Sequence, residues 1–136
     1  AMVTNTWVGN YYLGSDGMML TNTFTPDGYY VDANGVWSTS KWIQSGNRWW
    51  YRHYDGTYTT NDFEVIGNQT YYFDANGYMV IGWQNINGKF YYFNASGAMV
   101  TNTWVGNYYL GSDGIMLTNT TTPDGYYVGA DGAWMQ

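Results

Sequence analysis

Aromatic rings are the groups of this sequence that could do the most chemistry. The 136 residues include 8 Trp, 16 Tyr and 5 Phe, so aromatic side chains make up 21% of the chain. Ring faces attract cations and also stack on sugar rings, but the same rings can simply pack into a core. Their spacing therefore has to be understood first.

Catalytic groups are scarce. The single histidine, His53, lies in Tyr51-Arg52-His53-Tyr54 with no nucleophile motif nearby. Most Asp residues occupy turn positions, as Asp27 and Asp124 do, and no EF-hand spacing is present. The chain has no Cys, which excludes a disulfide scaffold, a thiol nucleophile and a Cys-based zinc site. We expect no enzyme activity, no metal and no cofactor.

Charge and hydropathy exclude several classes of binding partner. Four Lys and Arg against ten Asp and Glu give a net charge of −6, which argues against binding nucleic acid or an anionic membrane. No segment approaches the ~20 apolar residues that span a bilayer, and no signal peptide opens the chain. The chain opens directly in patterned sequence and ends abruptly at Gln136, so we expect a fragment of a larger protein.

Two long segments are near copies of each other. Residues Ala1 to Trp37 recur as Ala98 to Trp134, with 32 of 37 positions identical. Beneath this duplication runs a finer period of paired aromatics, usually Tyr-Tyr, each followed five residues later by Gly. We expect a single repeat domain, 1–136, with repeats at approximately 4–20, 21–37, 38–60, 61–80, 81–100, 101–117 and 118–134.

Each repeat is predicted to be a β-hairpin followed by a loop. In the fifth repeat, two aromatic-rich segments flank Asn87-Gly88, a strong hairpin signal because both turn residues favour positive φ. A lone hairpin cannot bury enough surface to fold, whereas stacked hairpins cover one another. The prediction is an all-β solenoid of about seven stacked hairpins with essentially no helix, in which most Tyr residues form the stacking core.

The segment from Gly82 to Met99 carries a family resemblance. It reads Gly-Trp, a short strand, a Gly turn, an aromatic followed by Tyr-Tyr, then Asn-x-x-Gly and Met. This pattern resembles the choline-binding, cell-wall-binding repeats of Gram-positive surface proteins, and is similar to glucan-binding and clostridial toxin repeats. The resemblance covers Thr4 to Trp134. It implies a choline-binding-module-like spiral of hairpins that binds choline or phosphocholine of cell-wall teichoic acids.

The resemblance also implies where choline would sit. The family cage takes two aromatics from one repeat and one from the next, closed by a hydrophobic residue that is often Met. By this rule two cages are complete, namely Trp83, Phe90 and Trp104 with Met99 nearby, and Trp42, Trp49 and Phe63. Thr70 removes a wall from the fourth repeat. The short repeats lack the same wall, so we expect them to be spacers or to recognise something else.

Other interpretations stay open. The alternative for each cage Trp is a structural role, in which the neighbouring hairpin covers its ring. Lys41 beside Trp42 counts against that site. Asn5, Asn22, Asn102 and Asn119 recur in phase, which suits either sugar hydroxyls or ordinary turns. The alternatives to choline are a glucan or other glycan ligand, and a passive spacer or assembly role. Exposed edge hairpins would permit a homodimer. The family implies an extracellular location on the cell surface or cell wall.

Overall fold

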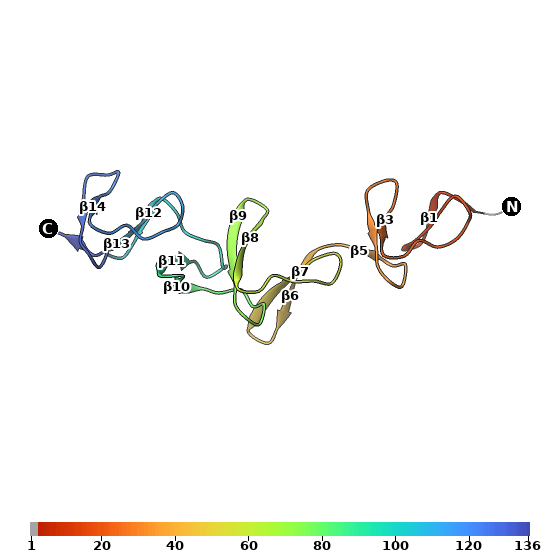
Figure 1. Cartoon of the computed structure of the whole chain (residues 1–136), viewed down its shortest axis with the longest axis horizontal. Coiled ribbons are helices and arrows are strands. Elements are labelled where there is room, and N and C mark those ends of the chain that lie inside the picture. Colours follow the sequence, from red (N-terminus) through yellow and green to blue (C-terminus); the bar gives the residue numbers. More distant parts are fainter. Residues whose placement is uncertain (1–2) are drawn as a thin grey trace. The chain divides into compact units, whose positions relative to one another are not determined.

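The chain forms two compact units of β-hairpins, Ala1–Thr59 and Thr60–Gln136. The computed structural model describes residues 3–136. Each hairpin is a small sheet of its own, joined to the next by a loop (Figure 1). The described residues contain no helix, and so none that could cross a membrane. The prediction of an all-β fold built from hairpin repeats is confirmed.

The first unit holds two short hairpins and one long hairpin. The second short hairpin gains a third strand. In chain order the strands are β1 (Thr6–Val8), β2 (Tyr11–Leu13), β3 (Thr23–Phe24), β4 (Tyr30–Val31), β5 (Trp37–Ser38), β6 (Lys41–Ser45) and β7 (Arg48–Arg52).

The second unit holds two long hairpins followed by two short ones. Its last sheet again has three strands, because the second duplicate repeats the arrangement of the first. The strands are β8 (Asp62–Ile66), β9 (Gln69–Phe73), β10 (Gly82–Ile86), β11 (Lys89–Phe93), β12 (Thr103–Val105), β13 (Tyr108–Leu110), β14 (Thr120–Thr121), β15 (Tyr127–Val128) and β16 (Trp134–Met135).

Turn chemistry sets the length of each hairpin. Asn87 and Gly88 both have positive φ, at 56° and 85°, as the predicted two-residue turn requires. In the first short hairpin Gly9 supplies the positive φ, at 61°. The longer turn after Pro26 ends in Gly28, whose φ is 91°. The hairpin turns predicted from these residues are thus present.

The asparagines that recur in phase shape the backbone. They lie in the left-handed region, where Asn is tolerated better than other side chains, with φ of 53° at Asn5 and 55° at Asn102. The N–H of Asn5 donates to the carbonyl oxygen of Gly14, and that of Asn102 to Gly111. Asn22, Asn61 and Asn119 have the same conformation. Ordinary turn chemistry therefore explains this polar row.

The fully buried core residue of most repeats directly follows the aromatic pair. Val31, Phe73, Phe93, Leu110 and Val128 are each at most 1% exposed. Most residues of the Tyr pairs themselves are half-buried or exposed, although Tyr12 and Tyr109 are buried. Many Tyr rings are consequently only partly covered by their neighbours.

In several repeats the glycine five residues after the aromatic pair has two roles. Gly35 and Gly132 have φ of 78° and 84°, so a side chain there would be strained. A methionine from an earlier repeat also packs on each glycine. A Cβ added to Gly35 would lie 2.6 Å from the Sδ of Met19, and one on Gly132 would lie 2.6 Å from the Cε of Met116. These glycines thereby let neighbouring repeats approach closely.

Candidate functional site

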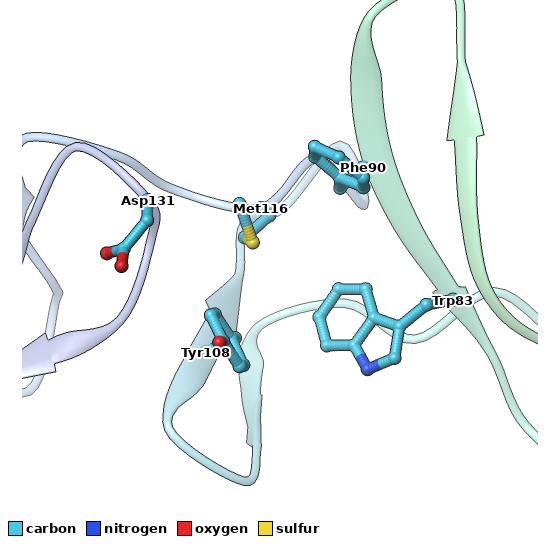
Figure 2. Close-up of a pocket in the computed structure, with 5 residues that line it drawn as sticks. All are labelled: Trp83, Phe90, Tyr108, Met116 and Asp131. Atoms are coloured by element: carbon cyan, nitrogen blue, oxygen red, sulfur yellow. The ribbon is translucent and has the colours of Figure 1, made fainter.

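The clearest aromatic pocket lies in the second unit and is lined by Trp83, Phe90, Tyr108, Met116 and Asp131, which we call the Trp83 box. Its volume is about 280 Å³. In Figure 2 the side chains of Phe90, Tyr108 and Met116 gather around the indole of Trp83, and Asp131 lies beyond Met116 and Tyr108. Three repeats thus contribute to one pocket.

Strand pairing places two walls of the box on one hairpin face. Trp83 pairs with Tyr92, and Asn85 pairs with Phe90. Because side chains alternate between the two faces of a strand, Trp83 and Phe90 point to the same side of the β10–β11 hairpin. Tyr91 points to the opposite side, where its ring lies 5.2 Å from that of Phe63 in the preceding repeat. One hairpin therefore serves two neighbours, one on each face.

The other walls come from the following repeats. The ring centroids of Trp83 and Tyr108 are 5.5 Å apart and their planes are inclined by 75°. The backbone N–H of Met116 donates to the carbonyl oxygen of Phe90 at 2.9 Å, which fixes the Met side chain beside the ring. Trp83 and Phe90 remain 38% and 41% exposed. The rings are held in place by their neighbours while their inner faces stay accessible.

The short repeats form two further pockets, one in each unit. The first is lined by Trp7, Gly9, Asn10, Tyr29 and Trp37, which we call the Trp7 box. The second is lined by Trp104, Gly106, Asn107, Tyr126 and Trp134, which we call the Trp104 box. Their volumes are about 250 and 290 Å³. Every lining residue of one box has its identical counterpart 97 positions away in the other.

Each short-repeat box has three aromatic walls. In the Trp7 box, Tyr29 stands nearly perpendicular to both indoles, at 80° to Trp7 and 83° to Trp37, with centroids 6.1 and 5.9 Å away. The corresponding angles at Tyr126 of the Trp104 box are 79° and 87°. Asn10 and Asn107 do leave one wall without an aromatic ring, but Trp37 on β5 and Trp134 on β16 supply a third aromatic wall.

One backbone hydrogen bond shows how the boxes correspond. Met116 donates to Phe90, Trp134 donates to Asn107 at 2.8 Å, and Trp37 donates to Asn10 at 2.8 Å. Asn therefore occupies the position of Phe90 in the short repeats, and Trp occupies the position of Met116. The aromatic wall lost from the first hairpin is replaced by a tryptophan from the next.

A carboxylate orients the first indole of each short-repeat box. The Nε1–H of Trp7 donates to Oδ2 of Asp27 at 2.9 Å, and that of Trp104 donates to Oδ2 of Asp124 at 2.8 Å. The hydroxyl of Thr25 donates to the other oxygen of Asp27. Hydrogen bonds from Thr25 and then Trp7 hold the pKa of Asp27 below its ordinary value of 3.8.

Asp124 is arranged in the same way. The hydroxyl of Thr122 and the indole of Trp104 lower its pKa from 3.8. Both carboxylates are solvent-exposed and ionised at neutral pH. Each short-repeat box thus has a fixed negative charge bound to the edge of one wall.

The structure distributes the predicted Trp83 set over different repeats. Trp83 and Phe90 line one box, as predicted. Trp104 lines the following box instead. Met99 donates its backbone N–H to Thr70 and packs on the core cluster of Val80, Ile86 and Phe93, at the preceding repeat. In the Trp83 box, Tyr108 and Met116 stand in the places where we expected Trp104 and Met99.

The second predicted set stays a prediction. Trp42 and Trp49 lie on the same face of the β6–β7 hairpin, because Trp42 pairs with Tyr51 and Gln44 pairs with Trp49. Phe63 belongs to the second unit, where its ring packs against Tyr72 and Tyr91.

Some lining residues were missed although the sequence contains a signal for them. Tyr29, Tyr108 and Tyr126 are each the first member of an aromatic pair. The glycine that comes five residues after the aromatic pair is followed two positions later by Met116, Trp37 or Trp134. The register that brings these positions back onto the previous hairpin is a tertiary property, so the repeat pattern alone did not single them out.

Metal chemistry has no candidate in the part of the chain that the structure describes. No three His, Asp or Glu side chains between residues 3 and 136 are arranged to hold a metal ion.

Family models match most of the chain. A model described as a choline-binding repeat matches residues 1–37 and 98–134, and a second model with the same description matches residues 60–104. The chain belongs to the choline-binding repeat family. Each of the two 37-residue matches contains one complete short-repeat box, so these choline-binding repeats coincide with the duplicated pockets.

Solved structures and a curated relative agree with this family. The choline-binding domain of CbpL from Streptococcus pneumoniae is 33% identical with a TM-score of 0.62, covering 98% of this chain and 87% of that one. Choline binding protein F from the same organism is 34% identical with a TM-score of 0.65, covering 93% and 43%. Glucosyltransferase-I of Streptococcus downei is 36% identical over 121 residues, which are 76% of this chain and 8% of that enzyme.

Proposed function

We propose that this chain is a non-catalytic cell-wall-binding module that recognises the choline residues of teichoic or lipoteichoic acids through aromatic boxes between successive hairpins. The observation that carries the proposal is the Trp83 box, where two aromatic walls of one hairpin meet Tyr108 and Met116 of the next repeat. The family and its choline-binding relatives support the same ligand.

The chemistry of the box suits a trimethylammonium group. Such a cation has no hydrogen-bond donor, so attraction must come from ring faces, each contributing about 0.5–2 kcal/mol. The steeply inclined rings of Trp83 and Tyr108 present faces and edges around one point rather than a single flat platform. The polarizable sulfur of Met116 closes the remaining side.

Electrostatics favour a cation over a neutral ligand. The chain carries a net charge of −6, and the carboxylate of Asp131 lines the Trp83 box. In the short-repeat boxes the indole N–H of Trp7 or Trp104 donates to a carboxylate, which draws negative charge toward the ring. We extend the proposal to these boxes because their walls and charge fit the same group.

Several weak sites on one chain suit a polymeric ligand. A surface that carries many choline groups can occupy several boxes at once, and linkage between sites then raises overall affinity without new contacts. This arrangement supports a role at the extracellular face of a cell wall.

A titration with choline tests the proposal directly. We expect saturable changes in tryptophan emission and a rise in melting temperature, because a ligand bound only to the folded state stabilises it. Trp83→Ala should weaken binding at its own box by about tenfold. Trp50→Ala is the matched control, since Trp50 packs on Tyr58 and lines none of the three boxes. A folded protein that is silent toward choline would refute the assignment.

A glycan ligand is the second candidate, because glucosyltransferase-I is a relative. Exposed rings such as Tyr126, 50% exposed, and Trp134, 41% exposed, are able to stack on sugars. Soluble glucan oligomers run beside choline distinguish the two. Saturation by glucan and not by choline would replace the choline assignment.

A further inference from the structure

The strongest unassigned feature is a basic cavity beside the Trp7 box. It has a volume of about 530 Å³ and is lined by Asp32, Trp37, Ser38, Thr39, Lys41, Ile43 and Arg52. Trp37 also lines the Trp7 box, so one indole separates an aromatic pocket from a polar one. Two of the four Lys and Arg residues of this acidic chain face this single cavity.

The two cations form an unfavourable pair. Lys41 on β6 lies directly opposite Arg52 on β7 in the strand register. Like charges at such positions destabilise a sheet, since the facing side chains share one side of the hairpin. Neither cation has an ion pair among the residues that the structure describes. The Nη1 of Arg52 reaches only the hydroxyl of Ser38, at 3.4 Å.

The single carboxylate in the cavity is already engaged. Oδ1 of Asp32 accepts hydrogen bonds from the backbone N–H groups of Asn34 and Val36, at 2.9 and 3.0 Å, within its own turn. The cavity is therefore lined by two positive charges and one negative charge, and the negative carboxylate is hydrogen-bonded to the backbone of its own turn. An anion between Lys41 and Arg52 would relieve their repulsion and gain hydrogen bonds from the guanidinium.

We propose that this cavity is an anion subsite that binds the phosphate of a phosphocholine group whose trimethylammonium occupies the adjacent Trp7 box. The inference rests on the proposed function for the ammonium end and adds a phosphate contact specific to the first unit. In phosphocholine only two carbons and one oxygen separate nitrogen from phosphorus. The two pockets share the wall Trp37, so the two ends of one such ligand would lie at neighbouring sites.

The second unit provides the internal comparison. Its identical Trp104 box has Gly129 where the first unit has Asp32, and Lys89 is the only Lys or Arg among residues 60–136. Lys89 lies at the turn end of β11 and lines neither the Trp83 box nor the Trp104 box. The Trp104 box should consequently bind the ammonium of phosphocholine with no cation nearby to hold its phosphate.

Residue-resolved NMR of the indole N–H signals tests the inference on the whole chain. Choline and phosphocholine are titrated separately, and the signals of Trp7 and Trp37 are compared with those of Trp104 and Trp134. At the Trp7 box phosphocholine should bind about three- to tenfold more tightly than choline. At the Trp104 box it should bind no better than choline, because the net charge of the chain repels a phosphate.

Variants separate this subsite from the aromatic box. The double variant Lys41→Gln/Arg52→Gln should abolish the preference for phosphocholine at Trp7 and Trp37, while choline affinity there should not fall, because two positive charges near the ammonium are removed. Lys89→Gln, which removes one positive charge from the other unit, should leave the preference intact. An unchanged ligand-free Trp7 signal in the double variant, and an unchanged ligand-free Trp83 signal in Lys89→Gln, show that the unit carrying each substitution keeps its fold.

Failure of the subsite is distinguishable from failure of the proposed function. An equal ratio of affinities at both boxes, or a preference that survives the double variant, would overturn the anion subsite while choline binding stands. Silence of every indole signal, including Trp83, toward both ligands would refute choline binding and the subsite together.

Discussion

The two 37-residue copies differ at five positions, and none of them lines its own box. Trp7, Asn10, Tyr29 and Trp37 all recur unchanged in the Trp104 box. At least two of the differences fall instead on residues that contact parts of the unit outside the copy. The copies therefore share one internal site and diverge in what surrounds it.

Two of the five differences show this divergence. Asn34 in the first copy corresponds to Asp131 in the second, which adds a carboxylate to the lining of the Trp83 box. Phe24, whose ring packs on Tyr30 and Tyr54, corresponds to Thr121. The same hairpin pair is thus adapted to a different neighbour in each unit.

The largest effect expected is on stability, at the recurring glycine. Gly35→Ala combines an unfavourable positive φ with displacement of Met19, so it should lower the free energy of unfolding by about 2 kcal/mol. Gly9→Ala has the same φ problem but nothing within 4 Å, and should cost about 1 kcal/mol. Urea unfolding measures both. Equal losses would show that the Met contact contributes nothing.

The same substitution in the other copy sharpens the comparison. Gly132→Ala displaces Met116, which is also a wall of the Trp83 box. It should therefore weaken choline binding at Trp83 in addition to lowering stability, whereas Gly35→Ala should leave the Trp83 signal unchanged. A choline titration followed at the Trp83 indole separates the two.

The next largest effect removes one box at a time. Trp37→Ala should weaken choline binding at the Trp7 box by about tenfold and leave the Trp104 box intact, and Trp134→Ala should do the reverse. The reason is that each tryptophan is a wall of the box in its own copy, where it makes the hydrogen bond that Met116 makes in the Trp83 box. Indole N–H titrations give both affinities. Cross-effects between the copies would contradict independent sites.

A smaller effect concerns the charge that distinguishes the copies. Asp131→Asn restores the residue of the first copy and should weaken choline binding at the Trp83 box by about twofold. Added salt should reduce this difference. The neutral analogue 3,3-dimethyl-1-butanol is the control ligand, and its affinity should not change. Equal losses for both ligands would indicate a packing effect instead of a charge effect.

The smallest effect is on the pH response. Asp27 and Asp124 have pKa values below 3.8 in the folded chain. When the pKa of a carboxyl is lower in the folded than in the unfolded chain, its ionised form stabilises the fold at pH values above the unfolded-state pKa. This stabilisation is lost as the pH falls through the folded-state pKa. The indole signals of Trp7 and Trp104 should thus titrate together, with midpoints below 3.8. Thr25→Val should raise the midpoint at Trp7 alone.

The sequence was sufficient for the hairpins and for half of the Trp83 site. Asn87-Gly88 and the two-residue alternation predict the β10–β11 hairpin and place Trp83 and Phe90 on one face. The walls from later repeats were harder to predict. Their positions depend on the hydrogen bond from Met116 to Phe90, which joins residues 26 positions apart and has no local sequence signal.

The short repeats show a second limit. Asn10 and Asn107 correctly predicted the loss of an aromatic wall, but β5 and β16 are strands of two residues that no periodicity reveals. Trp37 and Trp134 therefore looked like residues at the end of a repeat. The three-stranded pairing joins them to the second hairpin, and the hydrogen bonds from Trp37 to Asn10 and from Trp134 to Asn107 bring them back to the first.

The way in which the boxes are divided among repeats affects how such chains can grow. The Trp83 box draws on three successive repeats, so a cut or insertion between them destroys it. The Trp7 box lies entirely within residues 7–37, inside one duplicated segment. A recombination event that copies this segment therefore transfers a finished site to a new neighbourhood. Lengthening the chain by this cassette adds one site per copy, and the existing sites need no adjustment.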